Sequence, residues 1–317
     1  MTDAGGDPTS PRLKLTLGPV LFLWDEDRWR NFYFRIADEA EVDTVVIGET
    51  VCSKREHFHA PSIDEVAERL TRAGKEVRLA SLALVTASRE RKSVRRIAAQ
   101  DRFEVEVGEL SAVPQLRRRP FAVGPMVNVY NAPTAEVLGK LGARTICLPP
   151  ELSLASIDRI CRQAPSIEIE VFAFGKVPLA ISARCAHARF RGLTKDTCQF
   201  ICGEDRDGVA VDTLEGQQFL ALNGVQTVSG TCHSALAEVD ALRSSGVRAL
   251  RLSPQVCDMV AAARVFRDVI DGRLDSIAAS QVLAQAYPGA TFSNGFLYAR
   301  PGHQFVTADR PQPIADA

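Results

Sequence analysis

The sequence predicts an α/β protein built as a (β/α)8 barrel of the TIM-barrel type, in a regular or a distorted form. Short strand-like runs alternate with helical stretches along most of the chain. This alternation is typical of a parallel sheet covered by helices, and eight strand–helix units are the number that closes a barrel. No glycine-rich turn follows the first strand, so a Rossmann nucleotide site is not indicated. A doubly wound open sheet is the alternative.

The predicted elements follow in order. Strands are expected at residues 13–24, 43–49, 76–84, 102–107, 121–129, 144–149, 167–175 and 247–254. Helices are expected at residues 27–40, 62–75, 88–100, 133–142 and 153–164. The second helix opens with Ser62 and has Glu65 three residues later, a spacing that predicts a capping box, and it should stop at Gly74.

One long segment does not fit the repeating pattern. Residues 179–246 exceed what one loop and one helix need, so they are expected to form an insertion between strands seven and eight. Long insertions of this kind are usually functional. We therefore expect a single barrel-like domain over residues 12–300, a disordered tail at 1–11 and a flexible tail at 301–317.

Composition indicates a soluble globular protein, with 317 residues, 46% hydrophobic and 24% charged residues, and a net charge of −1. The first residues lack the apolar core of a signal peptide, and no apolar run reaches the roughly 20 residues that span a bilayer. We therefore expect a cytoplasmic protein, in which eight cysteines favour metal or redox use over disulfides.

The near-zero net charge argues against a general nucleic-acid binder. The basic runs at residues 89–96 and 117–119 are interpreted as a solvated helix face and a loop. A small phosphate or RNA contact is left open.

Three cysteines stand close together in "ISARCAHARFRGLTKDTCQFIC", with the spacing C-x12-C-x3-C. Cys198 and Cys202 are four residues apart, which on a helix places both sulfurs on one face. A fourth cysteine, Cys52 in "GETVCSKR", lies just beyond strand two. Because all strands of a barrel end on the same face, the loops after strands two and seven can meet there. Cys52 is therefore the candidate partner of Cys185, Cys198 and Cys202.

Four thiolates can hold zinc or an iron–sulfur cluster. The uneven spacing departs from the paired knuckles of structural zinc sites and favours a cluster, while zinc and an empty site stay open. Cys147 and Cys161 lie in apolar segments and are expected to be small buried hydrophobes. Cys232 and Cys257 have no partner at short spacing.

Seven segments carry a resemblance to a known family. They are, in order, "GPVLFLW", "VIGETVCSKR", "LALVTAS", "VNVYNAPTAEVLGKLGA", "VPLAISARC", "LNGVQTVSG" and "LRLSPQ". From about Leu15 to Pro254 the chain resembles the UbiV branch of the collagenase-like peptidase family, whose relatives include RNA hydroxylation proteins.

This resemblance implies a role in oxygen-independent ubiquinone biosynthesis, as a heterodimer with a UbiU-like partner. It implies hydroxylation of the ubiquinone ring precursor without O2, with prephenate as the hydroxyl donor. It also implies a [4Fe–4S] cluster held by Cys52, Cys185, Cys198 and Cys202. The alternatives are an RNA hydroxylation factor of the wider family, and a non-catalytic stabilising subunit with a structural cluster or zinc.

Proteolysis is not expected despite the family name. A cysteine protease needs a histidine base beside its thiol. His233 adjoins Cys232, but sequence neighbours point apart, and His57 and His59 are interpreted as surface loop residues.

Polar residues at strand ends are the remaining candidates, with Asn128 and Arg251 as the candidate catalytic residues. Arginine recognises carboxylates by paired hydrogen bonds, and asparagine offers both donors and acceptors. The structural alternative for Arg251 is an ion pair with an acid such as Glu49 or Glu170.

Weaker candidates stand beside these two. Arg184 has the same structural alternative as Arg251, and Tyr130 and Asn131 end strand five, where Asn131 has the alternative of a helix cap. Glu168 and Glu170 should point to one side of strand seven, toward the barrel interior and arginine partners.

Overall fold

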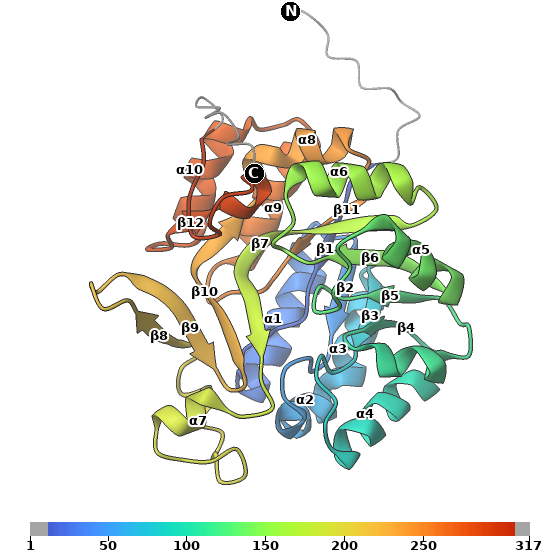
Figure 1. Cartoon of the computed structure of the whole chain (residues 1–317), viewed down its shortest axis with the longest axis vertical. Coiled ribbons are helices and arrows are strands. Elements are labelled where there is room, and N and C mark those ends of the chain that lie inside the picture. Colours follow the sequence, from blue (N-terminus) through green and yellow to red (C-terminus); the bar gives the residue numbers. More distant parts are fainter. Residues whose placement is uncertain (1–11, 308–317) are drawn as a thin grey trace, which may run out of the picture.

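The computed structural model describes residues 12–307 and contains a closed parallel barrel, as expected (Figure 1). Neighbouring strands pair in parallel in the order β11-β1-β2-β3-β4-β5-β6-β7, and β11 also pairs with β7, which closes the sheet. The barrel strands are β1 (Lys14–Leu17), β2 (Thr44–Ile47), β3 (Glu76–Ala80), β4 (Glu104–Val107), β5 (Phe121–Val123), β6 (Ala143–Leu148), β7 (Glu168–Ile181) and β11 (Ala249–Leu252). All eight predicted strands are present, and the open-sheet alternative is excluded.

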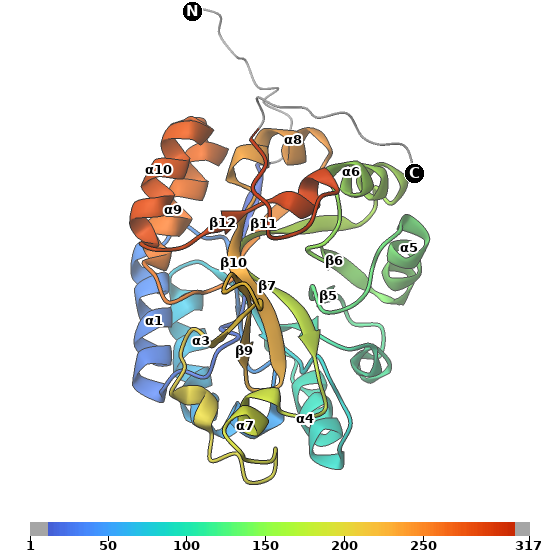
Figure 2. The ribbon, with the colours of Figure 1, turned by 60° about the vertical axis from the view of Figure 1, so that its left-hand side comes forward.

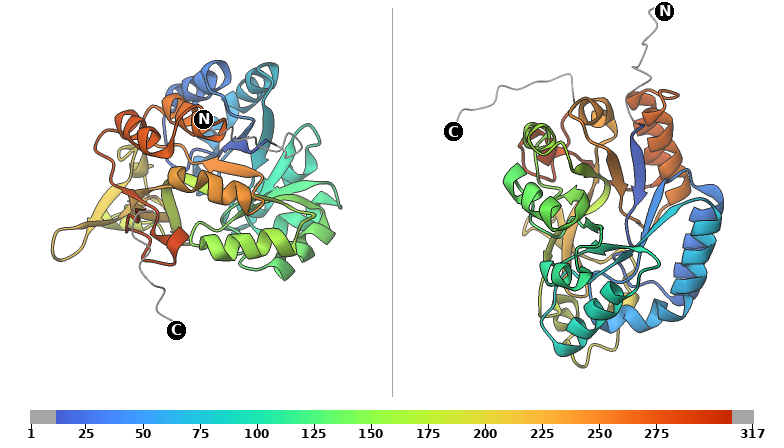
Figure 3. Two further views of the ribbon diagram at one scale, coloured as in Figure 1. Left: turned by 90° about the horizontal axis from the view of Figure 1, so that it is seen from above. Right: turned by 90° about the vertical axis from the view of Figure 1, so that its right-hand side faces the viewer.

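Helices surround the barrel, and the five that were predicted are present (Figure 3). The α-helices are α1 (Glu26–Glu39), α2 (Glu56–His59), α3 (Ile63–Arg72), α4 (Ser88–Ala99), α5 (Ala132–Leu141), α6 (Leu154–Gln163), α7 (Ala186–Phe190), α8 (Val239–Ser244), α9 (Met259–Ile270) and α10 (Ser276–Ala286). The 3-10 helices are η1 (Ser53–Arg55), η2 (Ala60–Ser62), η3 (Leu110–Leu116), η4 (Ile201–Gly203), η5 (Leu236–Glu238) and η6 (Gly295–Tyr298). Between β4 and β5 only the short η3 covers the barrel, so the helical layer is thin there.

The start of α3 corrects one prediction. Ser62 precedes the helix, but its hydroxyl donates to Glu26 Oε1 at 2.6 Å and makes no capping hydrogen bond. The capping box is therefore wrong, because a tertiary acceptor from α1 replaces the local one. The predicted stop at Gly74 is confirmed, since its φ of +78° ends the helix.

The insertion continues the barrel sheet outward. β7 is 14 residues long and runs beyond the barrel, where β10 (Gln226–Ser234) pairs with it antiparallel. β9 (Gln218–Asn223) and β8 (Val209–Asp212) extend this sheet, and β12 (Phe292–Ser293) pairs with β10 (Figure 2). Residues 182–225 thus form an excursion that starts with α7, while α8 belongs to the barrel itself.

The predicted tail at residues 1–11 and residues 308–317 lie outside the described residues. The folded part continues past residue 300, because Gln304 O accepts from Asn294 N and Gly295 N. Within residues 12–307, no helix is long and apolar enough to cross a lipid bilayer.

The barrel interior contains charged side chains. Arg251 donates from Nη1 to Glu106 Oε1 at 2.8 Å, pairs through Nη2 with Glu106 Oε2, and donates from Nε to Glu170 Oε1. Thr16 Oγ1 donates to Glu170 Oε2 at 2.6 Å, and Arg78 lies 3.9 Å from the same oxygen. These side chains are almost fully buried, and each charge has an opposite partner, as burial of a charge requires.

Candidate functional site

The four cysteines singled out in the sequence line one cavity at the C-terminal face of the barrel. They are Cys52, Cys185, Cys198 and Cys202. Figure 1 places α2 and α7 at this end of the molecule, where the loop after β2 meets the insertion after β7. The space enclosed is about 330 Å³, open solvent included. The loops after β2 and β7 therefore meet at this face, as the barrel topology predicts.

The loop after β2 presents Cys52. Glu49, which is buried, accepts from the backbone N–H groups of Val51 at 2.7 Å and Cys52 at 2.9 Å through Oε1. The chain then enters η1, in which Lys54 and Arg55 also line the cavity. The carboxyl group of Glu49 thus holds the backbone of the Cys52 loop in place through two hydrogen bonds.

Cys185 stands at the start of α7. Its sulfur accepts a hydrogen bond from Ala188 N at 3.3 Å, so the side chain caps this short helix. The cap fixes where the sulfur lies relative to the insertion.

Cys198 and Cys202 do not share an α-helix, so the one-face geometry of a helical spacing does not apply to them. Cys198 lies in irregular chain between two turns, and Cys202 lies in η4. Between them Gln199 and Phe200 adopt left-handed backbone, with φ of 48° and 55°. Such conformations are unfavourable for residues with a Cβ, and the tertiary contacts of the loop hold them in place.

Hydrogen bonds tie the two cysteine-bearing segments together. Lys54 Nζ donates to Lys195 O at 2.6 Å and to Asp196 O at 3.1 Å, which joins η1 to the loop before Cys198. Asn223 Nδ2 donates to Cys202 O at 3.0 Å, which joins β9 to η4. The cavity wall is therefore held by specific polar contacts in addition to packing.

The electrostatic environment of the thiols has two opposing parts. Burial raises the pKa of the Cys52, Cys185 and Cys202 thiols. The positive charge of Arg55 opposes this rise in pKa at Cys52 and Cys202. Lys54, Arg55 and Lys195 all line the cavity, so it is ready to receive negative charge.

No three His, Cys, Asp or Glu side chains within residues 12–307 converge closely enough to hold a single metal ion. The four cysteines surround a space and do not meet at one point. The other cysteines lie elsewhere: Cys147 and Cys161 are buried, as expected, and Cys232 and Cys257 do not line this cavity. Cys257 Sγ instead contacts Met259 Sδ at 3.5 Å.

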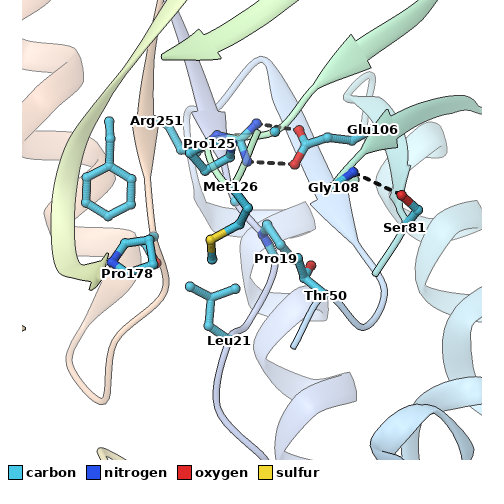
Figure 4. A pocket seen from close by; sticks show the side chains of 14 residues that line it. Pro19, Leu21, Thr50, Ser81, Glu106, Gly108, Pro125, Met126, Pro178 and Arg251 are labelled. Carbon is cyan, nitrogen blue, oxygen red and sulfur yellow. Dashed lines mark hydrogen bonds and ion pairs between the residues drawn. The ribbon is translucent and has the colours of Figure 1, made fainter. Parts of the chain in front are cut away.

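A second pocket occupies the barrel mouth, and Arg251 and Glu106 lie at its floor (Figure 4). It encloses about 400 Å³, open solvent included. Its walls are mainly apolar or small residues, among them Met126. Two hydroxyls on the wall, Thr50 Oγ1 and Ser253 Oγ, are buried and have no hydrogen-bond partner among residues 12–307. Arg251 reaches this pocket with its charge already balanced by two carboxylates.

Asn128 lies apart from Arg251. It is exposed and lines a third hollow, a groove of about 1420 Å³, open solvent included, between η3 and α5. Apolar side chains such as Val137 and Leu141 are exposed along it. Gly108 and Met126 line both this groove and the barrel-mouth pocket, so the two hollows adjoin. The two candidate catalytic residues therefore face different but neighbouring spaces.

The remaining candidates have structural contacts. Asn131 Oδ1 accepts from Thr134 N at 2.9 Å and caps α5. Tyr130 is half-exposed and its hydroxyl pairs with Glu151. Arg184 is exposed. Glu170 is fully buried in the barrel and bound by Arg251, whereas Glu168 is exposed at the start of β7.

The histidines do not activate a thiol in the described part of the chain. His59 is buried, stacked on Trp29 with ring centres 4.9 Å apart, so its interpretation as a surface residue is wrong. His187 Nε2 lies 3.0 Å from Asp205 Oδ2. Cys232 Sγ approaches only the backbone carbonyl of His233, and burial raises the pKa of this thiol far above its usual range.

Arg55 on the cavity wall and Asn223 behind it are not among the residues predicted from the sequence. Arg55 stands three residues after Cys52 in "GETVCSKR", and Asn223 opens "NGVQ" before β10. Arg55 could have been identified from its position in the same short motif as Cys52, the candidate metal ligand. Nothing local indicated Asn223, because its role depends on the fold of the insertion.

Comparisons with known proteins find curated proteins with partial similarity to this chain. The tRNA hydroxylation protein P of Escherichia coli is 31% identical over 86 residues, which is 26% of this chain and 19% of that protein. The protein of the same name from Helicobacter pylori is 24% identical over 216 residues, which is 62% of this chain and 50% of that protein. The chain thus spans at most about half the length of these relatives.

Solved structures are only distantly similar. A Coccidioides immitis structure described as a fructose-1,6-biphosphate aldolase has a TM-score of 0.40 and 10% identity, with 86% of each chain covered. At the level of families the match is broad, since the profile of peptidase family U32 matches residues 30–307. Because this match covers most of the 317 residues, the chain belongs to peptidase family U32.

Proposed function

We propose that this protein is a cytoplasmic subunit of an oxygen-independent hydroxylase, and that it carries a [4Fe–4S] cluster on Cys52, Cys185, Cys198 and Cys202. The observation that carries the proposal is the cavity lined by these four cysteines. Four sulfurs around a space of this kind suit a polynuclear cluster better than a single zinc ion, which draws its ligands to one point. The three basic side chains on the wall would offset the negative charge of a thiolate-bound cluster.

When bound, such a cluster supplies one-electron redox chemistry. The chain's own residues hold the ligands: Glu49 orders the Cys52 loop, α7 orders Cys185, and Asn223 anchors Cys202. The barrel-mouth pocket is the place for an organic substrate, because active sites of such barrels lie at this face. Its two unpartnered hydroxyls can bind oxygen atoms of a ligand.

The finer assignment is the ubiquinone pathway, with the ubiquinone ring precursor as substrate, a UbiU-like partner in a heterodimer and prephenate as hydroxyl donor. It rests on the motifs shared with the UbiV branch, above all "GETVCSKR" and the C-x12-C-x3-C segment. Hydroxylation itself is also the activity in the names of the curated relatives.

Protein purified without oxygen provides the test. Broad absorbance near ~400 nm and about four irons and four sulfides per chain are expected for the wild type. Cys52→Ala should lose this signal. Cys257→Ala, which removes a partly exposed cysteine away from the cavity, should keep it. One zinc per chain without iron would contradict the proposal and favour a structural site in a non-catalytic subunit.

A second candidate function is RNA hydroxylation, which the names of the relatives and the surface of α4 favour. This helix exposes five basic side chains: Arg89, Arg91, Lys92, Arg95 and Arg96. Arg89 Nε also donates to Ser53 Oγ, next to Cys52, so the basic face adjoins the cysteine cavity. Tight binding of unmodified tRNA that weakens steeply with salt, and that Arg91→Glu with Arg95→Glu abolishes, would support this alternative over the quinone pathway.

A further inference from the structure

Arg55 is a buried cation on the wall of the cysteine cavity. Only 1% of its surface is exposed, and it lines the cavity together with the four cysteines. Buried guanidinium groups are normally neutralised by a carboxylate. Arg55 forms no salt bridge with any carboxylate of residues 12–307, in contrast to Arg251 and Arg267, which are equally buried.

Backbone and amide oxygens hold the guanidinium instead. Nη1 donates to Leu21 O at 3.1 Å, and Nη2 donates to Asn223 O at 3.1 Å and to Asn223 Oδ1 at 2.7 Å. Gln226 Nε2 donates to the same Leu21 O at 2.7 Å and so fixes the acceptor. These contacts leave the full positive charge in place and set the plane of the guanidinium.

One donor of this group has no partner in the described part of the chain. Nε is buried and makes no hydrogen bond. The guanidinium lines the cavity together with Cys202, and its positive charge acts directly on the Cys202 thiol. Glu49 forms no salt bridge with Arg55 in this part of the chain, and its Oε1 accepts from the N–H groups of Val51 and Cys52.

The surrounding backbone is shaped to admit this side chain. Gly224 has a φ of +69°, and a Cβ at that position would lie 2.2 Å from Arg55 Nη2. The neighbouring Asn223 binds Arg55 through its oxygen and the Cys202 and Asp205 carbonyls through its nitrogen. One side chain therefore positions both the cation and the segment that carries the sulfur.

We propose that Arg55 donates its Nε–H to the Cys202 sulfur of the bound cluster and raises the reduction potential of that cluster. This inference rests on the proposed function. One-electron reduction adds a negative charge to the cluster, and both a nearby buried cation and an N–H···S hydrogen bond favour the reduced form. Lys54 and Lys195 are partly exposed, so water screens their charges more than that of Arg55.

The test is an equilibrium redox titration of the cluster, followed by electron paramagnetic resonance, after iron and sulfide have been counted in each sample. Arg55→Met should lower the equilibrium constant for one-electron reduction at least tenfold, which is 59 mV. Arg55→Lys keeps the charge and should recover part of the loss. Lys195→Met removes one charge from the same wall at a partly exposed position and should change the constant less than threefold.

Equal potentials in wild type and fully loaded Arg55→Met would overturn the inference, as would an equal shift in Lys195→Met. If Arg55→Met does not fold, wild type loaded with cluster in D2O decides. Its iron–sulfur stretching frequencies should differ from those of protein loaded in H2O, because the N–H bound to sulfur is deuterated, and identical spectra would overturn the inference. A wild-type protein without any iron would instead refute the proposed function itself.

Discussion

His233 should make the stability of this protein depend on pH between neutrality and pH 4. Its ring is buried on β10, and neither nitrogen has a hydrogen-bond partner among residues 12–307. Burial lowers its pKa from 6.5 to about 4, because the charged imidazolium is poorly solvated there. Between these two pKa values the unfolded chain binds a proton at His233 that the folded chain does not bind. The contribution of His233 to the free energy of unfolding is therefore fully present above pH 6.5 and is lost as the pH falls toward 4.

The magnitude follows from the two pKa values. At 1.36 kcal/mol per pKa unit, the gap between 6.5 and about 4 corresponds to about 3 kcal/mol, of which about 2 kcal/mol is lost between pH 7 and pH 5. His233→Leu replaces the imidazole with an apolar side chain of similar size and so removes the titrating group. Its free energy of unfolding should fall about 2 kcal/mol less than that of wild type over this pH interval.

Urea unfolding followed by tryptophan fluorescence measures this difference, since Trp24 and Trp29 are both buried. All other titrating groups are common to the two proteins, so the difference between the two pH dependences isolates His233. At pH 7 the variant should be at least as stable as wild type, because it no longer buries two unpaired polar atoms. Parallel pH dependences would refute the reasoning and place a solvated or paired imidazole in the folded state.

Three further predictions concern the barrel and its helices. Arg251→Met should cost about 3–5 kcal/mol in urea unfolding, because it leaves buried Glu106 without its cation and Glu170 with only the more distant Arg78, and an unchanged midpoint would contradict the ion-pair network. Gly224→Ala should destabilise by well over 1 kcal/mol, since its added Cβ meets a guanidinium at 2.2 Å, whereas Gly216→Ala has a similar φ of +79° in open space and should cost only about 1 kcal/mol. Asn131→Ala should cost about 1 kcal/mol by thermal unfolding through loss of the α5 cap, while Asn128→Ala on the exposed groove should change stability by less than ~0.5 kcal/mol.

The barrel could be predicted because its signals are local. Each buried strand is a short run of β-branched and apolar residues, and each helix shows its own periodicity. The grouping of Cys52 with Cys185 across more than a hundred residues also followed, because one topological rule places all strand ends on one face. The prediction needed no knowledge of the intervening structure.

What could not be predicted depends on distant partners. The left-handed backbone at Gln199 and Phe200 has no signature in residue type, since neither is a glycine. Ser62 turned to Glu26 of another helix, and Arg55 found acceptors in Leu21 and Asn223, which are far away in the chain. These hydrogen bonds depend on which distant segments the fold brings together, so the local sequence does not predict them.

The division of the four cysteines between two parts of the chain has a consequence for the resistance of the protein to proteolysis. Cys52 belongs to the barrel, while the other three belong to the excursion that follows β7. Any group bound by all four would clasp the excursion to the barrel, and its binding free energy would be added to the stability of that contact. Losing the group would loosen the excursion first and expose residues 182–225 to proteases. If that group is the proposed iron–sulfur cluster, the lifetime of the polypeptide would depend on the supply of iron and on oxidative damage.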